Sequence, residues 1–311
     1  MCDIDVVILT HHPDERFLRL VAMLRKQTQP VRKIFIVNTG PDPLAVGKQS
    51  SREIADGYDL VVDQIEKKEF DHGGTRRMAA KRSDAPFLLF MTQDAVPQDT
   101  ELTKRLLRPL LEDEKAYASY ARQLPRKGAA PEEAFERNFN YPEASRTQTA
   151  ADLATLGFKT FYCPNVCALY KKSAYDALGG FEKKAIFNED VYLAEKAIRA
   201  GYHICYAADA KVIHSHGYTC IQQLHRNFDQ GVSQAMHREA FADVPQEGEG
   251  MRLVRECTHY LLHAGHAARI PYFYVKCAFR LTGYQLGKHY AILPRSVNRM
   301  LAMNKTFFGE I

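Results

Sequence analysis

The chain has 311 residues, of which 46% are hydrophobic and 25% are charged, and its formal net charge is +5. These values describe an ordinary globular protein that can bury a core, either as one large domain or as a domain with an appendage. No apolar run approaches the roughly 18 residues of a membrane-spanning helix, which excludes a protein built around such helices.

Buried strands and helices alternate along the first hundred residues. Continuous apolar runs predict strands buried on both faces at residues 4–10, 33–40, 58–65 and 86–94. Apolar residues at helical spacing predict a helix after the first strand, through Phe17, Leu20, Val21 and Leu24. Residues 73–83 predict a further helix, which is entered through glycines. This alternation is typical of an α/β protein with a parallel sheet built from βαβ units.

Polar residues follow three of these strands, in the segments THH, NTG and TQDA. In open α/β sheets ligands bind beyond the carboxyl ends of the strands, so we expect a ligand there. The sequence FDHGGTRR at residues 70–77 adds glycines, a helix N-terminus and two arginines, which suit a pyrophosphate; a surface turn that starts a helix explains them equally well. The chain contains no GxGxxG after the first strand, no Walker loop and no GxSxG, which disfavours dinucleotide enzymes, P-loop NTPases and α/β-hydrolases.

Two segments offer ligands for a divalent cation. In TQDAVP, Asp94 follows the fourth strand, where it either caps the next helix or supplies an oxygen ligand to Mg²⁺ or Mn²⁺. In VIHSHG, strand alternation places His214 and His216 on the same face. Lone histidines are commonly structural, but a same-face pair near carboxylates favours a metal site.

The alternating pattern changes after residue 115. We expect a strand in AYASYARQLPR, an irregular segment to about residue 145, and strands in TFYCPNVCALYKK and YHICYAADAKVIHSHG. From about residue 220 the pattern is helical. The seven cysteines are scattered, and CPNVC has no second pair to complete a zinc site, which predicts free thiols in a reducing compartment. Because no signal peptide is visible, we expect a cytoplasmic protein.

A helix is predicted in FNEDVYLAEKAIRAGY, residues 187–202, and two adjacent carboxylates stand at its start. Asn188 is a good N-cap, Glu189 and Asp190 suit the helix dipole, and Gly201 ends the helix. The alternative is that one of the carboxylates is catalytic. The two roles are compatible, because a helix N-terminus also holds a carboxylate ionised.

The order of these motifs resembles the family 2 glycosyltransferases of the GT-A fold, from Val6 to about Thr219. Within that family, the words FDHGGTRR, FMTQDAVP, RQLPR, FNYPE, FYCPNVCALY and YAADAKVIHSH resemble the bacterial rhamnosyltransferase branch. The resemblance implies a mixed, mainly parallel sheet flanked by helices. It places a catalytic domain at residues 1–219 and a helical C-terminal region at residues 220–311.

The resemblance also implies a metal site. The DxD of the family falls on Thr92, Gln93 and Asp94. Because Thr92 replaces the first aspartate, Asp94 is left as the principal carboxylate ligand. The late metal-ligating histidine of the family matches His214, with His216 as the alternate.

Roles for the base and the donor site follow from the same resemblance. The catalytic base matches Asp190, and Glu189 is expected to orient the acceptor or the local hydrogen bonds. The residues expected to line the nucleotide sugar are Thr10, His11, Asn38, Asp71, His72, Gly74, Arg76, Gln93 and Asp94.

These roles predict an inverting glycosyltransferase that uses a nucleotide sugar and a divalent cation, Mg²⁺ or Mn²⁺. Asp190 would take the proton of the acceptor hydroxyl, and a cation at Asp94 would neutralise the leaving diphosphate. The resemblance implies dTDP-L-rhamnose as the donor and a growing cell-surface polysaccharide or lipid-linked glycan as the acceptor. The alternatives are a UDP-sugar donor, a non-catalytic nucleotide-sugar-binding protein and a basic peripheral scaffold.

The C-terminal tail concentrates the positive charge of the chain. From residue 265 onward Glu310 is the one acidic residue, against the basic residues Arg269, Lys276, Arg280, Lys288, Arg295, Arg299 and Lys305. Aromatic residues are mixed with these cations, which predicts either helices that pack on the catalytic domain or a peripheral contact with an anionic membrane. No RNA or DNA motif accompanies the charge, so nucleic-acid binding is not expected; self-association stays open.

Overall fold

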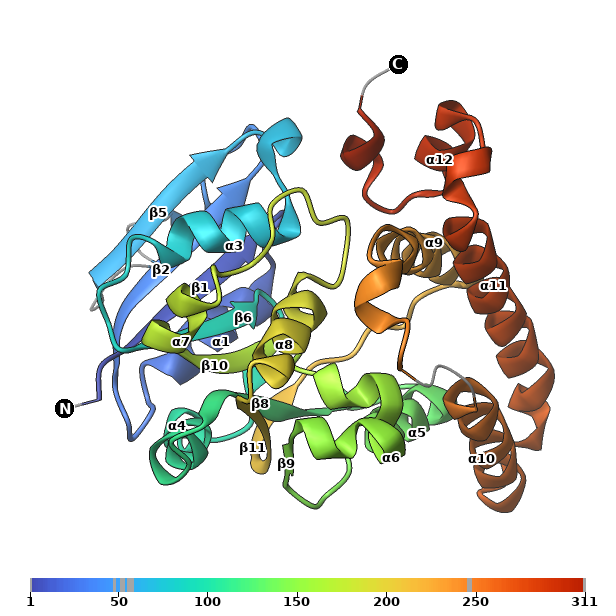
Figure 1. Cartoon of the computed structure of the whole chain (residues 1–311), viewed down its shortest axis with the longest axis horizontal. Helices are drawn as coiled ribbons and strands as arrows, with labels where there is room; N and C mark the ends of the chain where they lie inside the picture. The colour runs from blue at the N-terminus through green and yellow to red at the C-terminus, as the bar shows by residue number, and fades with distance from the viewer. Residues whose placement is uncertain (1, 47–48, 51–53, 55–58, 245–247, 310–311) are drawn as a thin grey trace.

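The computed structural model describes residues 2–46, 49–50, 54, 59–244 and 248–309. A nine-stranded sheet has the order β5-β2-β1-β6-β10-β8-β11-β7, and β9 pairs with β11 (Figure 1). Its strands are β1 (Ile4–Thr10), β2 (Val31–Thr39), β5 (Asp59–Ile65), β6 (Phe87–Thr92), β7 (Val96–Pro97), β8 (Ala116–Leu124), β9 (Arg146–Gln148), β10 (Cys167–Lys171) and β11 (His203–Ile213). A separate small sheet pairs β3 (Ala45–Val46) with β4 (Gln49–Ser50).

Helices flank the sheet and extend the molecule beyond one of its ends (Figure 1). The first group is α1 (Glu15–Leu24), α3 (His72–Ala80), α4 (Leu102–Glu112), α5 (Pro131–Asn140), α6 (Leu153–Leu156), α7 (Lys172–Ala177) and α8 (Glu189–Arg199). The second group is α9 (Cys220–Met236), α10 (Glu249–His263), α11 (Ile270–Lys288) and α12 (Arg295–Leu301). Short 3-10 helices lie at Lys67–Glu69, Ala150–Asp152, Gly157–Phe161, Arg238–Phe241, Ala267–Arg269, Tyr290–Ile292 and Lys305–Phe308.

The four strands predicted in the first hundred residues are confirmed, and they run parallel to one another. Tyr58, the first residue of the predicted third strand, lies outside the described residues. The register aligns Thr10 with Asn38 and Asn38 with Gln64, so the polar ends of three strands share one edge. β10 runs antiparallel between β6 and β8, which makes the sheet mixed, as the resemblance implied.

Two apolar layers bury the two faces of the sheet. On one face, Ile4, Val6 and Ile8 of β1 pack in the same cluster as α1. The predicted apolar side of α1 is at most 3% exposed and comprises Phe17, Leu20, Val21 and Leu24. The opposite face packs against α3, α7 and α8. Because β1 is buried on both faces, its sequence is apolar throughout instead of alternating.

Two local predictions are wrong. The segment expected to be irregular after β8 contains α5, which begins at Pro131 with Glu132 and Glu133 in its first turn. Proline at the first helical position and acidic residues in the first turn are typical start signals, so this helix was readable from the sequence. The strand expected over residues 160–172 is shorter, because Gly157–Phe161 forms a 3-10 helix and only Cys167–Lys171 is extended.

The helices α9 to α12 form the right-hand part of Figure 1, with α11 along the outer edge. A Cβ on Gly283 of α11 would lie 2.2 Å from the Leu224 carbonyl oxygen, and one on Gly287 would lie 2.1 Å from that of Phe228. Only glycine allows α9 and α11 to approach this closely. None of the described helices is long and apolar enough to cross a membrane. All seven cysteines are free thiols, as predicted.

Three of the seven basic residues of the tail are paired or buried within the protein. Arg269 and Arg280 pair with Glu132 and Glu136 of α5, and Lys276 is only 4% exposed. The two arginines therefore hold the start and the middle of α11 against α5, and Lys276 is buried. The first of the two alternatives for the tail, packing on the catalytic domain, therefore accounts for them.

Candidate active site

The carboxyl ends of β1, β2 and β5 form one edge of the site. Thr10 Oγ1 donates to Asn38 Oδ1 at 2.8 Å, and Asn38 Nδ2 donates to Gln64 Oε1 at 2.9 Å. The amides of Asn38 and Gln64 also donate to the Asp42 carbonyl, at 3.0 and 3.1 Å. Both predicted residues, Thr10 and Asn38, are thus buried supports for the loop that follows β2, and the exposed Gln64 supports the same loop from β5.

Gln93 joins the ends of β1 and β6. Its Oε1 accepts from the backbone N–H of His11 at 2.8 Å, and its Nε2 donates to the His11 carbonyl at 3.1 Å. His11 Nδ1 donates to the Thr39 carbonyl at 2.9 Å while its side chain stays exposed at the edge of the sheet. Gln93 is therefore occupied in holding the backbone, and His11 is available to a ligand.

Asp94, His214 and His216 meet beside this edge. The two Nε2 atoms lie 2.9 Å apart. The Nε2 atom of His214 lies 3.6 Å from Asp94 Oδ1, and that of His216 lies 3.4 Å from Asp94 Oδ2. One ligand atom of each residue lies within 4.8 Å of the other two. The structure thus brings together the three residues that the sequence proposed as metal ligands.

The spacing and chemistry of these atoms fit one divalent cation. Octahedral ligands at 2.0–2.1 Å from an ion lie about 2.9 Å from their neighbours, and tetrahedral ligands about 3.4 Å. Burial lowers the pKa of His214 well below its ordinary value and also lowers the pKa of His216, so both imidazoles are neutral near pH 7 and can ligate. Two nitrogens and a carboxylate are compatible with several divalent ions.

The N-terminus of α3 packs tightly against the segment before α8. Asp71 Oδ1 caps the helix by accepting from the backbone N–H groups of Gly73 and Gly74, at 3.1 and 3.0 Å. It also accepts from the N–H of Ala185 at 3.2 Å. A Cβ on Gly73 would lie 1.9 Å from the Glu182 carbonyl oxygen, and one on Gly74 would lie 2.0 Å from the Asp71 carboxylate. Close packing therefore explains both glycines and the aspartate.

Arg76, which the resemblance places near the nucleotide sugar, forms a buried ion pair with Glu189. Its Nη1 lies 2.9 Å from Glu189 Oε1, and both side chains are 7% exposed. Asn165 Nδ2 donates to the same oxygen at 3.1 Å. Burial alone would raise the pKa of Glu189, but the Arg76 guanidinium holds that pKa below its ordinary value. Glu189 is therefore ionised and engaged in local hydrogen bonds.

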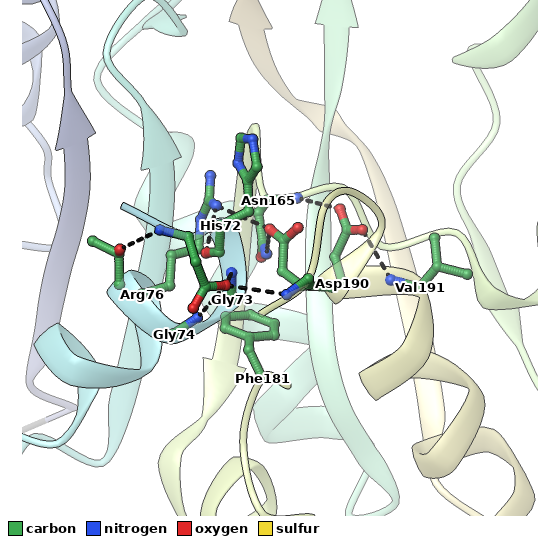
Figure 2. Close-up of polar contacts among 12 residues, drawn as sticks. His72, Gly73, Gly74, Arg76, Asn165, Phe181, Asp190 and Val191 are labelled. Atoms are coloured by element: carbon green, nitrogen blue, oxygen red, sulfur yellow. Dashed lines mark hydrogen bonds and ion pairs between the residues drawn. The ribbon is translucent and has the colours of Figure 1, made fainter. Parts of the chain in front are cut away.

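Asp190 lies next to this pair, in the first turn of α8. Its Oδ2 accepts from the backbone N–H of Asn165 at 3.1 Å, and its Oδ1 accepts from that of Val191 at 2.9 Å (Figure 2). Burial and the adjacent charge of Glu189 raise the pKa of Asp190 to about 7. Neighbouring carboxylates whose pKa values are pushed in opposite directions are typical of an acid–base site.

Asn188 occupies the N-cap position of α8, but its side chain does not cap the helix. Its φ is +63°, and its Nδ2 donates to Ser233 Oγ of α9 at 3.4 Å. Ser233 Oγ also donates to the Phe187 carbonyl at 2.6 Å. Asparagine tolerates this left-handed conformation better than most residues, so it turns the chain sharply before the two carboxylates.

Arg226 of α9 lies between the metal group and the loop before α8. Its guanidinium carbon is 4.7 Å from the ring centre of Phe187 and 5.7 Å from that of Tyr218. Tyr218 stacks on His216 at 4.9 Å, and the ring of Phe187 lies 6.4 Å from that of His72. Within the described part of the chain Arg226 forms no ion pair, which leaves its charge available to an anionic ligand.

Sequence reasoning found residues of the metal group and of the carboxylate pair. It missed Gln64, Gln123, Asn165 and Arg226, which contact or support these residues. Gln123 lies in RQLPR and Asn165 in CPNVC, so their segments were marked although the residues were not selected. Arg226 lies in a helix that carried no comparable signal.

Comparison with known proteins agrees with this geometry. Residues 5–179 match the family described as Glycosyl transferase family 2. The chain belongs to this family. This family 2 glycosyltransferase is 34% identical over 310 residues to O-antigen chain rhamnosyltransferase RfbN of Salmonella typhimurium. The aligned region covers 99% of this chain and 96% of the relative. It is also 36% identical over 290 residues to O-antigen chain rhamnosyltransferase WbaN of Salmonella anatum. That alignment covers 92% of this chain and 89% of the relative.

Solved structures of similar shape confirm the predicted GT-A fold of this family 2 glycosyltransferase. The mannosyltransferase PcManGT from Pyrobaculum calidifontis, in complex with GDP-Man and Mn²⁺, has a TM-score of 0.53 at 14% identity, over 98% of this chain and 84% of that chain. TarS 1–349 of S. aureus has a TM-score of 0.54 at 14% identity, over 98% of this chain and 88% of that chain. The chain is thus a glycosyltransferase with a mixed, mainly parallel sheet flanked by helices.

Proposed function

We propose that this glycosyltransferase transfers L-rhamnose from dTDP-L-rhamnose, with inversion, to a growing O-antigen chain or another lipid-linked glycan. The assignment of the sugar rests on the two relatives, which are both named O-antigen chain rhamnosyltransferases and match at least 92% of this chain. The reaction type rests on Asp190, whose raised pKa contrasts with the ionised Glu189 beside it. A general base is most effective when its pKa lies near the working pH.

Asp190 would take the proton of the acceptor hydroxyl as that oxygen attacks the anomeric carbon of the donor. Two backbone N–H groups, from Asn165 and Val191, hold its carboxylate in one orientation. Glu189 is held ionised by Arg76 and makes Asp190 more basic, because two adjacent negative charges repel each other. The chain thus supplies both the position and the basicity of the proton acceptor.

The diphosphate that leaves the donor gains negative charge during the reaction, so positive charge is needed beside it. A divalent cation held by Asp94, His214 and His216 would supply it. Arg226 adds a second positive charge next to this group, since it forms no ion pair within the described residues. Cations aimed at developing negative charge in a site that excludes water are an effective form of transition-state stabilisation.

The predicted donor-site residues fall into two groups. His11 and His72 are the side chains that we propose to line the nucleotide sugar directly. Thr10, Asn38, Asp71, Gly74, Arg76 and Gln93 shape the same wall through hydrogen bonds and close packing, because their polar groups are already engaged.

Donor hydrolysis by the purified protein, measured with a panel of nucleotide sugars and Mn²⁺ or Mg²⁺, tests the proposed donor. We expect dTDP-L-rhamnose to be turned over with a kcat/KM at least about 10-fold above that of UDP-sugars, the scale of one or two missing pocket contacts. Preference for a UDP-sugar would contradict the donor assignment while leaving the enzyme class intact. Binding of nucleotide sugars without hydrolysis or transfer would instead indicate a binding module.

The outward face of α11 is mainly apolar and carries no charge before Lys288. Its exposed residues are Pro271, Tyr274, Val275, Ala278 and Leu281, followed by the uncharged polar residues Thr282 and Gln285. Tyr274, Val275 and Leu281 are 47–59% exposed. Lys276 and Arg280 lie on the opposite side of the helix, so no charged side chain interrupts this face before Lys288. Contiguous exposed apolar surface of this kind marks a site of contact with another molecule or with lipid.

We propose that this outer face of α11 contacts an anionic membrane surface, where a lipid-linked acceptor would be found. Lys288 is exposed and lies seven residues after Leu281, which places it on the same side of α11. Two parallel copies of the face pressed together would bring their Lys288 side chains toward each other, whereas anionic headgroups complement this charge. A lipid surface therefore suits the face better than a second copy of the chain.

Replacing Leu281 with glutamate is expected to lower binding to anionic vesicles by at least about 10-fold, because burying a leucine contributes roughly 1.5–3 kcal/mol. Vesicle flotation measures this, and wild-type binding should weaken at high salt because salt screens the headgroup charges. The matched control is Leu111→Glu on α4, since Leu111 is 57% exposed and Leu281 is 59% exposed. Equal binding by both variants, or no wild-type binding at any salt concentration, would exclude this contact. Loss of a dimer in L281E would identify a second copy as the occupant.

A further inference from the structure

Gln123 connects the metal ligand His214 to helix α5. It lies in β8 and is 1% exposed. Its Oε1 accepts from His214 Nδ1 at 2.9 Å and from Arg137 Nη1 of α5 at 2.5 Å. One amide oxygen thus receives two donors, one from a metal ligand and one from a guanidinium.

This arrangement determines which nitrogen of His214 faces the metal position. A glutamine amide can turn either its oxygen or its NH₂ group toward a neighbour, but a guanidinium can only donate. Arg137 therefore requires the oxygen of Gln123 on this side. An oxygen at that point requires a proton on His214 Nδ1, and a neutral imidazole then carries its lone pair on Nε2. That is the atom that faces Asp94 and His216.

We propose that Arg137 is a positioning residue for the cation site, which acts through Gln123 to hold His214 in the tautomer and orientation that ligate a metal. The proposal rests on the proposed function only in that both use the same cation site. Hydrogen-bond partners behind a metal-ligating histidine commonly change metal affinity by 10–100-fold.

The C-terminal helices hold Arg137 in place. Glu132 of α5 forms two bonds of 2.7 Å with Arg269, and Glu136 forms bonds of 2.6 and 2.8 Å with Arg280. Arg269 directly precedes α11 and Arg280 lies within it, so these bidentate pairs fix α5 along its length. The cations of the tail that turn inward therefore support the cation site, and the helical region at residues 220–311 contributes to the catalytic unit.

Binding of Mn²⁺ alone to the full-length protein tests this proposal, by titration calorimetry or by the change in melting temperature. Arg137→Met should weaken Mn²⁺ binding by about 10-fold or more. Adding Gln123→Glu to that variant should restore affinity to within about 3-fold of wild type, because a carboxylate only accepts and needs no arginine to orient it. Arg108→Met is the control, since it removes a surface ion pair between α4, a helix other than α5, and Asp209 of β11.

Three results would overturn the proposal: wild-type affinity in R137M, loss of affinity in R137M without rescue by Q123E, or no Mn²⁺ binding by the wild type. If R137M does not fold, as judged by circular dichroism in chelator, the single variants at position 123 decide instead. Q123E should then bind Mn²⁺ like wild type, and Q123M should bind it at least about 10-fold more weakly. No donor sugar is present, so failure of the rhamnose assignment would leave these results unchanged.

Discussion

Replacing Asp190 with asparagine is expected to lower the rate of sugar transfer by at least about 100-fold, which is the usual scale for a lost general base. The amide has nearly the same shape as the carboxylate but cannot take the acceptor proton. Nucleotide-sugar affinity should change by less than about 3-fold, because Asp190 accepts bonds from Asn165 and Val191 and is not proposed to touch the donor. If D190N transferred sugar at the wild-type rate, Asp190 would not be the catalytic base and would serve only at the start of α8.

The pH dependence of transfer gives an independent readout of the same carboxylate. Because burial and the charge of Glu189 raise the pKa of Asp190 to about 7, the wild-type kcat/KM should rise as the pH passes through about 7 and Asp190 loses its proton. In D190N this rise should disappear. A wild-type profile that is flat between pH 5.5 and pH 8.5 (roughly one and a half units to either side) would argue against Asp190 as the base.

The stability of D190N separates loss of chemistry from loss of folding. The folded-state pKa of Asp190 is raised above its ordinary value of 3.8, so its contribution to stability is fully present below pH 3.8 and is lost as the pH rises through about 7. Above pH 7 the wild type carries an unfavourable buried charge that the variant lacks. D190N should therefore melt at an equal or higher temperature than wild type at pH 8.5. A lower melting temperature would mean that asparagine disturbs the structure.

Removing the divalent cation is expected to have the second-largest effect on sugar transfer. Chelator should abolish transfer, and Asp94→Ala should weaken binding of the nucleoside diphosphate by about 10-fold or more, because the product's charge loses its counterion. Arg76 and Arg77, the two arginines that the sequence offered to a pyrophosphate, are engaged with Glu189 and with the Phe181 carbonyl. Calorimetric titration with dTDP, in the presence of Mn²⁺ and then of chelator, measures the loss.

A matched control for D94A is Asp209→Ala, which removes a surface carboxylate paired with Arg108. Its diphosphate affinity should equal that of wild type. Full transfer activity in chelator would show that protein cations suffice for the leaving group. Arg226 would then be the first residue to test, because it lies beside His216 and Tyr218 and forms no ion pair within the described residues.

The sequence by itself determined the features that depend on local periodicity. The strand predicted at residues 4–10 is β1, and the four apolar residues predicted for the first helix are those that α1 buries. The sequence also placed His214 and His216 together, and their Nε2 atoms lie 2.9 Å apart, although β11 ends at Ile213 and the two histidines follow the strand instead of alternating within it. Burial on one or two faces imposes a repeat of 2.0 or 3.6 residues, and such repeats are visible in a single sequence.

The tertiary structure decided which polar groups are already engaged. Arg76 pairs with Glu189 across 113 positions, and Arg280 pairs with Glu136 across 144. The sequence could name each charge but not its partner, so it assigned Arg76 to a ligand and left Arg280 open between packing on the catalytic domain and contact with a membrane. Periodicity shows that a residue is buried or exposed, whereas an ion pair depends on where two distant segments meet in the folded chain. That same meeting of distant segments brings Arg137, Gln123 and His214 together behind the metal site.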